Sequence, residues 1–189
     1  MNTVEPIKDI RQIEGMKKVL RGQSPRDWLL FVLGINSALR VSDLLRLRQS
    51  DVYDDRGRVL ESLRIRESKT NKEKSFRLNA SAKKTLEEYA CSVGHHPEAY
   101  LFLSRNGDNK PISRGQAWLI INGAAKVVGI TQPIGTHTLR KTFGYHAYKG
   151  GTAIELIMVA LNHSSIASTK RYIGITQDDI DSVYISTCL

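Results

Sequence analysis

The sequence predicts a mainly α-helical domain of the α+β class with a small antiparallel β-sheet. Apolar residues recur at helical spacing over most of the chain, two short segments near the middle alternate with a period of two, and no linker is long enough to divide the chain. Its 189 residues suffice for one hydrophobic core of ordinary size. We therefore expect a single domain over residues 1–189.

The first part of the chain predicts three helices. Apolar residues at helical spacing place the first over residues 9–20, within an N-terminal lead-in segment of about residues 1–23. A serine cap at Ser24, followed by a proline and a first-turn acid, begins the second, which runs to about Ser37. This helix is apolar nearly all round, so we expect it at the centre of the core. A third, short helix begins at Ser42.

Alternation of apolar and polar residues over 63–66 and 75–78 predicts two antiparallel strands. The polar run over residues 68–72 lies between them and is expected to form the turn of a β-hairpin. A third strand is expected near residues 52–60, beside this hairpin.

Helical spacing returns after the hairpin and continues toward the C-terminus. One helix begins at Ser81, and the capping box Ser113-x-x-Gln116 begins another that ends at about Val128, before Gly129. The remaining helices are expected at residues 137–148, 153–160 and 165–172, with a short one after Thr176.

Charge is distributed unevenly along the chain. There are 28 Lys and Arg against 19 Asp and Glu, a net charge of +9. None of the basic residues follows Tyr172, whereas three acids do. A strongly basic body with a short acidic and apolar tail favours a polyanionic partner for the body. Charge alone leaves open a basic soluble protein without such a partner.

Membrane and secreted classes are disfavoured. The longest apolar run, residues 28–35, is far shorter than the roughly 18 residues of a membrane-spanning helix. The N-terminus lacks the apolar core of a signal peptide, and the two cysteines, Cys91 and Cys188, do not suggest a disulfide framework. We expect a cytoplasmic protein without a membrane partner.

Metal-binding patterns in the sequence are weak. Two adjacent aspartate pairs lie in a predicted turn and near a helix start, and these positions explain them. Cys91 with His95 and His96 lacks a fourth ligand nearby, so a helix end with polar residues explains these three better than a metal site does. We expect no metal and no cofactor.

His137 and Arg140 lie three residues apart and therefore share a face of their predicted helix. Arginine offers a rigid fork of donors suited to a phosphate, and histidine offers a donor or a proton carrier near neutral pH. Taken alone, the pair is better explained as two solvated polar groups at a capped helix start.

Four more residues have both an ordinary and a chemical interpretation. Arg40 directly follows the buried helix and needs an anionic partner, which could be Asp43 or a bound phosphate. Lys69 lies at the expected hairpin tip and His163 at a helix junction, where a solvated lysine and a capping histidine are the ordinary alternatives. Tyr172 follows two basic residues and is either packed or a nucleophile whose developing phenolate is stabilised by nearby cations.

In order and spacing, these residues together resemble the active-site set of the tyrosine recombinases, the phage integrase family. The similar segments are Ala38-Leu39-Arg40-Val41-Ser42-Asp43-Leu44 for the first arginine, His137-x-Leu139-Arg140-Lys141-Thr142-Phe143 for the second, and Leu161-x-His163-Ser164-Ser165 with Thr169-x-x-Tyr172 for the later histidine and the nucleophile. The resemblance covers roughly residues 5–185. Asn162 stands where the family usually has glycine, and Ala38 where glycine is common.

The resemblance implies that the protein cleaves and rejoins DNA strands without metal or ATP, through a 3′-phosphotyrosyl link to Tyr172. The catalytic roles it implies are clamping of the phosphate by Arg40 and Arg140, a hydrogen bond to that phosphate from His163, handling of the tyrosine proton by His137, and protonation of the leaving oxygen by Lys69. Asp43 is expected to support Arg40 without acting directly. Lys141, Lys170 and Arg171 are expected to contact backbone phosphates.

The partner implied by the resemblance is double-stranded DNA, with accessory DNA-bending proteins as further candidates. We expect a tetramer on DNA and a monomer in solution. The tail over residues 175–189 is expected to form a helix that is exchanged between protomers, and packing on its own domain is the alternative. Most family members carry an additional N-terminal helical DNA-binding domain. None is expected here, so the chain resembles short, invertase-type members or a catalytic fragment.

Three alternatives belong to other classes. The first is a non-catalytic DNA-binding module that retains the fold, and the second is a relaxing enzyme of the type IB topoisomerase kind. The third is a basic RNA-binding protein, which the sequence disfavours because aromatic residues make up only 7% and lie mostly in apolar helical faces.

Overall fold

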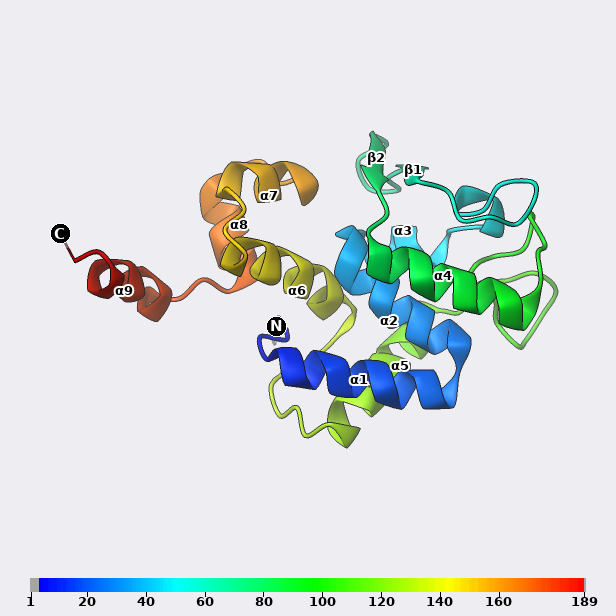
Figure 1. Cartoon of the computed structure of the whole chain (residues 1–189), viewed down its shortest axis with the longest axis horizontal. Coiled ribbons are helices and arrows are strands. Elements are labelled where there is room, and N and C mark those ends of the chain that lie inside the picture. The colour runs from blue at the N-terminus through cyan, green and yellow to red at the C-terminus, as the bar shows by residue number, and fades with distance from the viewer. Residues whose placement is uncertain (1–3, 189) are drawn as a thin grey trace.

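The computed structural model describes residues 4–188, the side chain of Val183 excepted, as a mainly helical fold with a small sheet (Figure 1). The fold class expected from the sequence is confirmed. In chain order the elements are α1 (Ile10–Gln23), α2 (Pro25–Ser37), α3 (Val41–Leu45), the 3-10 helix η1 (Gln49–Asp51), β1 (Ser62–Arg66), β2 (Glu73–Arg77), α4 (Ala80–Val93), α5 (Arg114–Val127), α6 (Thr136–Lys149), α7 (Ile154–Ala160), α8 (Ile166–Ile173) and α9 (Gln177–Ser186).

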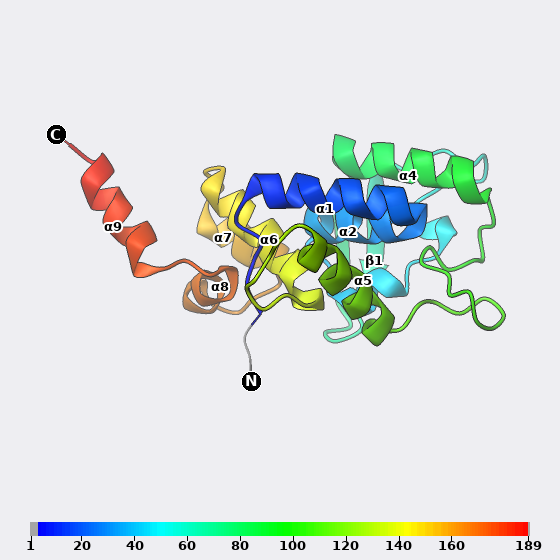
Figure 2. The ribbon, with the colours of Figure 1, turned by 90° about the horizontal axis from the view of Figure 1, so that it is seen from below.

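Helix α2 lies at the centre of the fold, as its apolar sequence predicts. Leu29 and Leu33 belong to a core shared with α3, β1 and α4, whereas Phe31 and Val32 belong to a second core shared with α1, α5 and α6. Figure 2 shows α1 and α4 alongside α2. Burial on every side explains why the helix has no polar face.

Close packing brings α6 against α2. A Cβ atom at Gly34 of α2 would lie 2.5 Å from the Leu139 side chain, so only glycine allows α6 to approach this near. Because α6 carries His137 and Arg140, this contact sets where both side chains lie relative to the end of α2.

The sheet is a two-stranded hairpin in the described part of the chain. Strands β1 and β2 pair antiparallel, with Leu63 opposite Phe76 and Arg66 opposite Glu73. The expected third strand near residues 52–60 is wrong. That segment closes on itself through a single bridge between Tyr53 and Val59, because the Asp54 carboxylate accepts backbone hydrogen bonds from the turn that follows it.

Helices α6, α7 and α8 enclose a third, smaller core that includes Tyr145, Ile157, Leu161 and Ile173. A Cβ atom at Gly144 would lie 2.5 Å from Ile173, so the glycine permits α8 to sit tightly on α6. Tyr172 precedes Ile173, and this contact therefore sets the position of the tyrosine as well.

Helix α9 extends away from the rest of the fold (Figures 1 and 2). Ile180, Tyr184 and Ile185 are 43%, 78% and 83% exposed, and an ion pair of 2.6 Å between Lys149 and Asp179 ties the helix to α6. Ile175, by contrast, packs against the core formed by α6, α7 and α8, so the tail contacts its own domain at its start and leaves these three side chains of α9 exposed. Leu189 and the Val183 side chain, also part of the apolar tail, lie outside the described residues. Within residues 4–188, no helix combines the length and apolar character that crossing a membrane requires.

Candidate active site

The six catalytic residues predicted from the sequence lie around one pocket of about 350 Å³. Its lining residues are Arg40, Lys69, His137, Arg140, Asn162, His163, Ser164, Ser168 and Tyr172. They come from the end of α2, the hairpin turn, the start of α6, the α7–α8 junction and α8. The fold therefore gathers side chains that are far apart in the sequence.

Arg140 is held in place by backbone carbonyl groups. It is 3% exposed, and its guanidinium donates to the carbonyl oxygens of Ala38, which follows α2, and Leu161, which follows α7. Ala38 has a left-handed backbone with φ 55°, which ends α2 and turns the chain toward Arg40. Burial lowers the pKa of Arg140, and the nearby hydroxyl of Tyr172 opposes this shift. The guanidinium is thus oriented before any ligand binds.

Arg40 forms a largely buried ion pair with Glu67. Arg40 Nη1 lies 2.7 Å from Glu67 Oε1, and the two side chains are 17% and 1% exposed. Burial by itself raises the pKa of Glu67, but hydrogen bonds from Thr70, Arg40 and Asn162 together lower it to about 2. The carboxylate is therefore ionised at neutral pH.

The expected support of Arg40 by Asp43 is corrected. Asp43 Oδ1 accepts hydrogen bonds from the backbone nitrogen and the hydroxyl of Ser68, at 2.9 and 2.5 Å. Asp43 therefore anchors the hairpin turn that carries Lys69, and among the described residues the carboxylate that neutralises Arg40 is Glu67.

Lys69 lies in the turn between β1 and β2, as predicted, and its side chain is exposed. The turn is closed by hydrogen bonds from Glu67 N to Lys72 O and from Asn71 N to Glu67 O, both 2.9 Å. The backbone around Lys69 is thus well anchored, while its ammonium is free to reach a ligand in the pocket.

Both histidines have a lowered pKa, which favours the neutral imidazole. Burial and the positive charges of Arg140 and Arg40 lower the pKa of His163 to about 4, and burial with Arg140 and Lys141 lowers that of His137. His163 Nδ1 lies 3.1 Å from the hydroxyl of Thr169, which already donates to Ser165 O at 2.9 Å. His163 therefore donates from Nδ1, and its Nε2 is left as an acceptor.

Tyr172 lies among cations and against His163. The two rings meet edge-on, with centroids 4.8 Å apart and planes at 80°. Burial raises the pKa of Tyr172, while the charge of Arg140, a hydrogen bond with Arg140 and the charge of Arg40 act in the opposite direction. The phenol is neutral in the free protein, and a phenolate formed during reaction would be stabilised by the two guanidinium groups.

The three residues expected to contact DNA phosphates differ in exposure. Lys170 and Arg171 are exposed in the last turn of α8 and are available to a polyanion. Lys141 is only 5% exposed, and its Nζ lies 5.3 Å from the ring centroid of Tyr172. The structure therefore gives no support to the expected phosphate contact of Lys141, because its place on α6 turns the side chain inward.

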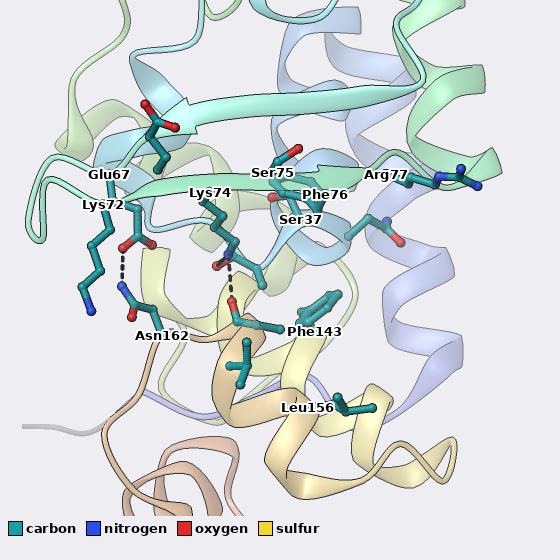
Figure 3. Close-up of a pocket in the computed structure, with 15 residues that line it drawn as sticks. Ser37, Glu67, Lys72, Lys74, Ser75, Phe76, Arg77, Phe143, Leu156 and Asn162 are labelled. Carbon is teal, nitrogen blue, oxygen red and sulfur yellow. Dashed lines mark hydrogen bonds between the residues drawn. The ribbon is translucent and has the colours of Figure 1, made fainter.

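Several residues of the site were missed by the sequence reading. Lys74 Nζ donates to Ala160 O at 2.8 Å, and burial lowers its pKa to about 8 (Figure 3). Glu67 could have been found, because strand alternation places it on the same side as the inward-facing Leu63 and Ile65. Asn162 and Thr169 lie in segments that carry the family resemblance, but nothing in the sequence predicts their contacts with Glu67 and His163. Within residues 4–188, no group of three or more His, Cys, Asp or Glu could hold a metal ion.

Comparison with known proteins gives the same family as the resemblance of the pocket residues. The sequence matches the Phage integrase family over residues 8–178. "Probable integrase/recombinase YoeC" of Bacillus subtilis (strain 168) is 42% identical over 184 residues, which cover 97% of this chain and 97% of that protein. "Tyrosine recombinase XerD" of Corynebacterium glutamicum is 29% identical over 163 residues, which cover 84% of this chain and 51% of that protein.

Solved structures show the same fold at lower identity. The crystal structure of XerA recombinase has a TM-score of 0.76 and 22% identity, and the match covers 96% of this chain and 65% of that one. XerH site-specific recombinase, bound to its palindromic difH substrate in a post-cleavage complex, has a TM-score of 0.77 and 17% identity over 98% and 53% of the two chains.

The chain thus spans nearly all of YoeC and about half of the XerD relative and of the XerH structure. The family match covers most of the chain, and the relative from Bacillus subtilis is similar almost from end to end. This chain belongs to the phage integrase family, the tyrosine recombinases.

Proposed function

We propose that this chain breaks and rejoins DNA strands at specific sites, with Tyr172 as the nucleophile. One observation carries the proposal: Tyr172 shares a pocket with two oriented arginines, two histidines and an exposed lysine. In the reaction, Tyr172 Oη attacks the scissile phosphorus, the bond from Oη to phosphorus forms, and the bond to the 5′ oxygen breaks. Because the phosphodiester energy is kept in the tyrosyl link, the reverse attack by the 5′ hydroxyl needs no ATP.

The arginines stabilise the negative charge that develops on the phosphate. Arg140 is fixed by the Ala38 and Leu161 carbonyls, and Arg40 by Glu67, so neither has to reorganise when the substrate arrives. Rigid guanidinium forks suit the non-bridging oxygens of a phosphate.

Of the remaining three groups, two transfer protons and the third contacts the phosphate. His137 is neutral and accepts the phenol proton from Tyr172, and Lys69 donates a proton to the departing 5′ oxygen. His163 contacts the phosphate only when its Nε2 carries a proton, since Nδ1 is engaged with Thr169. A bound phosphate favours this protonation because its negative charge raises the pKa of the imidazole.

We also propose that double-stranded DNA organises four copies of the chain, which is monomeric when free in the cytoplasm. Helix α9 extends away from its own fold, and its apolar residues Ile180, Tyr184 and Ile185 are exposed (Figure 1). A hollow of about 530 Å³ between the hairpin and α7 is lined by Phe76, Phe143, Leu156 and Val159, with Lys72 at its edge (Figure 3). Its apolar lining and basic edge suit the apolar and acidic α9 of a neighbouring protomer.

Sedimentation velocity tests this assembly. We expect the wild-type chain to sediment as a monomer alone and as a tetramer on DNA. Truncation after Gly174 should abolish the tetramer while leaving DNA binding intact. A stable tetramer without DNA, or a truncated chain that still forms tetramers, would overturn this assembly.

Covalent capture tests the reaction itself. Nicked duplexes made from the DNA flanking the gene are incubated without divalent metal with wild-type protein, with Tyr172→Phe, and with Tyr148→Phe as a matched control on α6. We expect an SDS-resistant protein–DNA adduct with wild type and the control, and none with Tyr172→Phe. No adduct with wild type, despite salt-sensitive binding, would favour a non-catalytic DNA-binding module. Relaxation of supercoiled DNA without a paired site would favour a type IB topoisomerase-like enzyme.

A further inference from the structure

The Glu67 carboxylate accepts contacts from three separate parts of the chain. Arg40 Nη1 lies 2.7 Å from Oε1, while Thr70 Oγ1 and Asn162 Nδ2 donate to Oε2 at 2.7 and 2.6 Å. Figure 3 shows the Asn162 amide directed at this carboxylate. Since Glu67 is 1% exposed, the contacts are shielded from water and from competing ions.

These contacts fix the chain on both sides of Lys69. Glu67 lies two residues before Lys69 and Thr70 directly after it, and the two are hydrogen-bonded to each other. Ser68, between Glu67 and Lys69, is held by Asp43. The backbone at Lys69 is therefore anchored, although the side chain itself is exposed.

Asn162 connects this turn to the other half of the site. It lies between Leu161, whose carbonyl orients Arg140, and His163. Its φ of 46° is left-handed, a conformation that asparagine tolerates better than other side chains of its size. A glycine would adopt this backbone but could not donate to Glu67, and an aspartate would place a second carboxylate there.

We propose that Asn162 is a positioning residue for Lys69, acting through Glu67 and Thr70. The inference rests on the proposed function, in which Lys69 protonates the leaving 5′ oxygen. General acids work only when they lie within hydrogen-bond reach of that oxygen, so a shifted turn reduces the rate without removing the acid.

A substrate with sulfur in place of the bridging 5′ oxygen distinguishes a misplaced general acid from a disturbance of the rest of the active site. A thiol has a pKa near 8.5 and leaves as a thiolate without being protonated, so it does not need the lysine. Single-turnover cleavage is measured on the oxygen and the sulfur substrates for wild type, Lys69→Ala, Asn162→Gly and Thr70→Val. Asn109→Gly is the matched control, because Asn109 is also left-handed and its side chain also makes hydrogen bonds, here to the backbone of Tyr100 and Glu98 and outside the pocket.

We expect Lys69→Ala to slow cleavage of the oxygen substrate by roughly 100-fold or more, with most of the loss restored by sulfur. Asn162→Gly and Thr70→Val should each lose about 10-fold on oxygen and be restored in the same way. Their double variant should lose less than the product of the two, because both act on the same carboxylate oxygen. Asn109→Gly should cleave both substrates like wild type.

Two failures are distinguishable. If sulfur does not restore Lys69→Ala, Lys69 is not the acid and the proposed function is wrong at this residue. If sulfur restores Lys69→Ala but leaves Asn162→Gly and Thr70→Val equally slow on both substrates, the proposed role of Asn162 is overturned while that of Lys69 stands. Thr70→Val keeps the test decisive if Asn162→Gly does not fold.

Discussion

The ammonium of Lys141 lies 5.3 Å from the centroid of the Tyr172 ring, and Lys141 is only 5% exposed. A cation over the face of an aromatic ring is attracted by its quadrupole. This contact joins α6 to α8 directly beside Arg140, and it places a positive charge near the phenol. The lysine therefore packs against the proposed nucleophile, whereas the sequence alone suggests contact with DNA.

Replacing Lys141 by methionine should lower single-turnover cleavage by roughly 3- to 30-fold, the equivalent of about 0.5–2 kcal/mol of cation–π attraction. Methionine keeps much of the buried stem and removes the charge. The salt dependence of DNA binding should remain that of the wild type, as measured by fluorescence anisotropy over a salt series. A reduced salt slope would show that Lys141 does contact phosphate.

Lys170→Met, in contrast to the Lys141 variant, should change the salt dependence of DNA binding. Lys170 is exposed on α8, so loss of one phosphate contact should reduce the slope of log K against log salt by about 0.9. Affinity should fall equally for all DNA sequences, because a phosphate contact carries no base information. A loss confined to one sequence would refute this assignment.

Glu67 should make the protein sensitive to acid. Its pKa in the folded protein is about 2, below the ordinary value of 4.5, so its contribution to stability is complete above pH 4.5 and is lost as pH falls toward 2. In urea unfolding over this range, Glu67→Gln should show a weaker pH dependence than wild type. Glu67→Ala should lose roughly 3 kcal/mol at pH 7, because it leaves Arg40 without its partner. An unchanged acid profile in Glu67→Gln would contradict the pairing.

His163 should titrate far below an ordinary histidine. We expect an NMR titration midpoint near pH 4 in the free protein, assigned by loss of the signal in His163→Asn. Because its folded pKa lies below 6.5, protonation opposes folding, and stability should decline as pH falls from 6.5 toward 4. Addition of a DNA duplex should raise the midpoint, and a midpoint unchanged by DNA would exclude contact between His163 and a phosphate.

Alanine substitutions at two glycines, one against α8 and one in open space, test whether glycine is needed where α8 packs on α6. Gly144→Ala should destabilise the protein by roughly 1–3 kcal/mol and slow cleavage, because the new Cβ would meet Ile173 beside Tyr172. Gly123→Ala on α5 meets nothing within 4 Å and should stabilise the protein by about 0.5–1 kcal/mol without changing cleavage. Thermal unfolding and single-turnover assays of both variants check this. Equal effects of the two substitutions would show that Gly144 does not set the position of α8.

Much of the local structure follows from the sequence, because periodicity and capping act within a few residues. The apolar run of α2, the capping box that begins α5 and the alternation in β1 and β2 each predict an element that is present. The resemblance of Arg40, His137, Arg140, His163 and Tyr172 to the active-site set of the family likewise predicts residues that line one pocket.

Only the tertiary structure decided which groups meet. The anionic partner of Arg40 is Glu67 and not Asp43, which is nearer in the sequence. Lys141 faces Tyr172 and not solvent. Asn162 reaches Glu67 across two loops, and the segment after η1 closes on itself without joining the sheet. Sequence patterns report the backbone preference and the buried side of one segment. Pairing of a buried charge is chosen by the contacts between segments, since the group that loses its water must find its partner wherever the fold brings one.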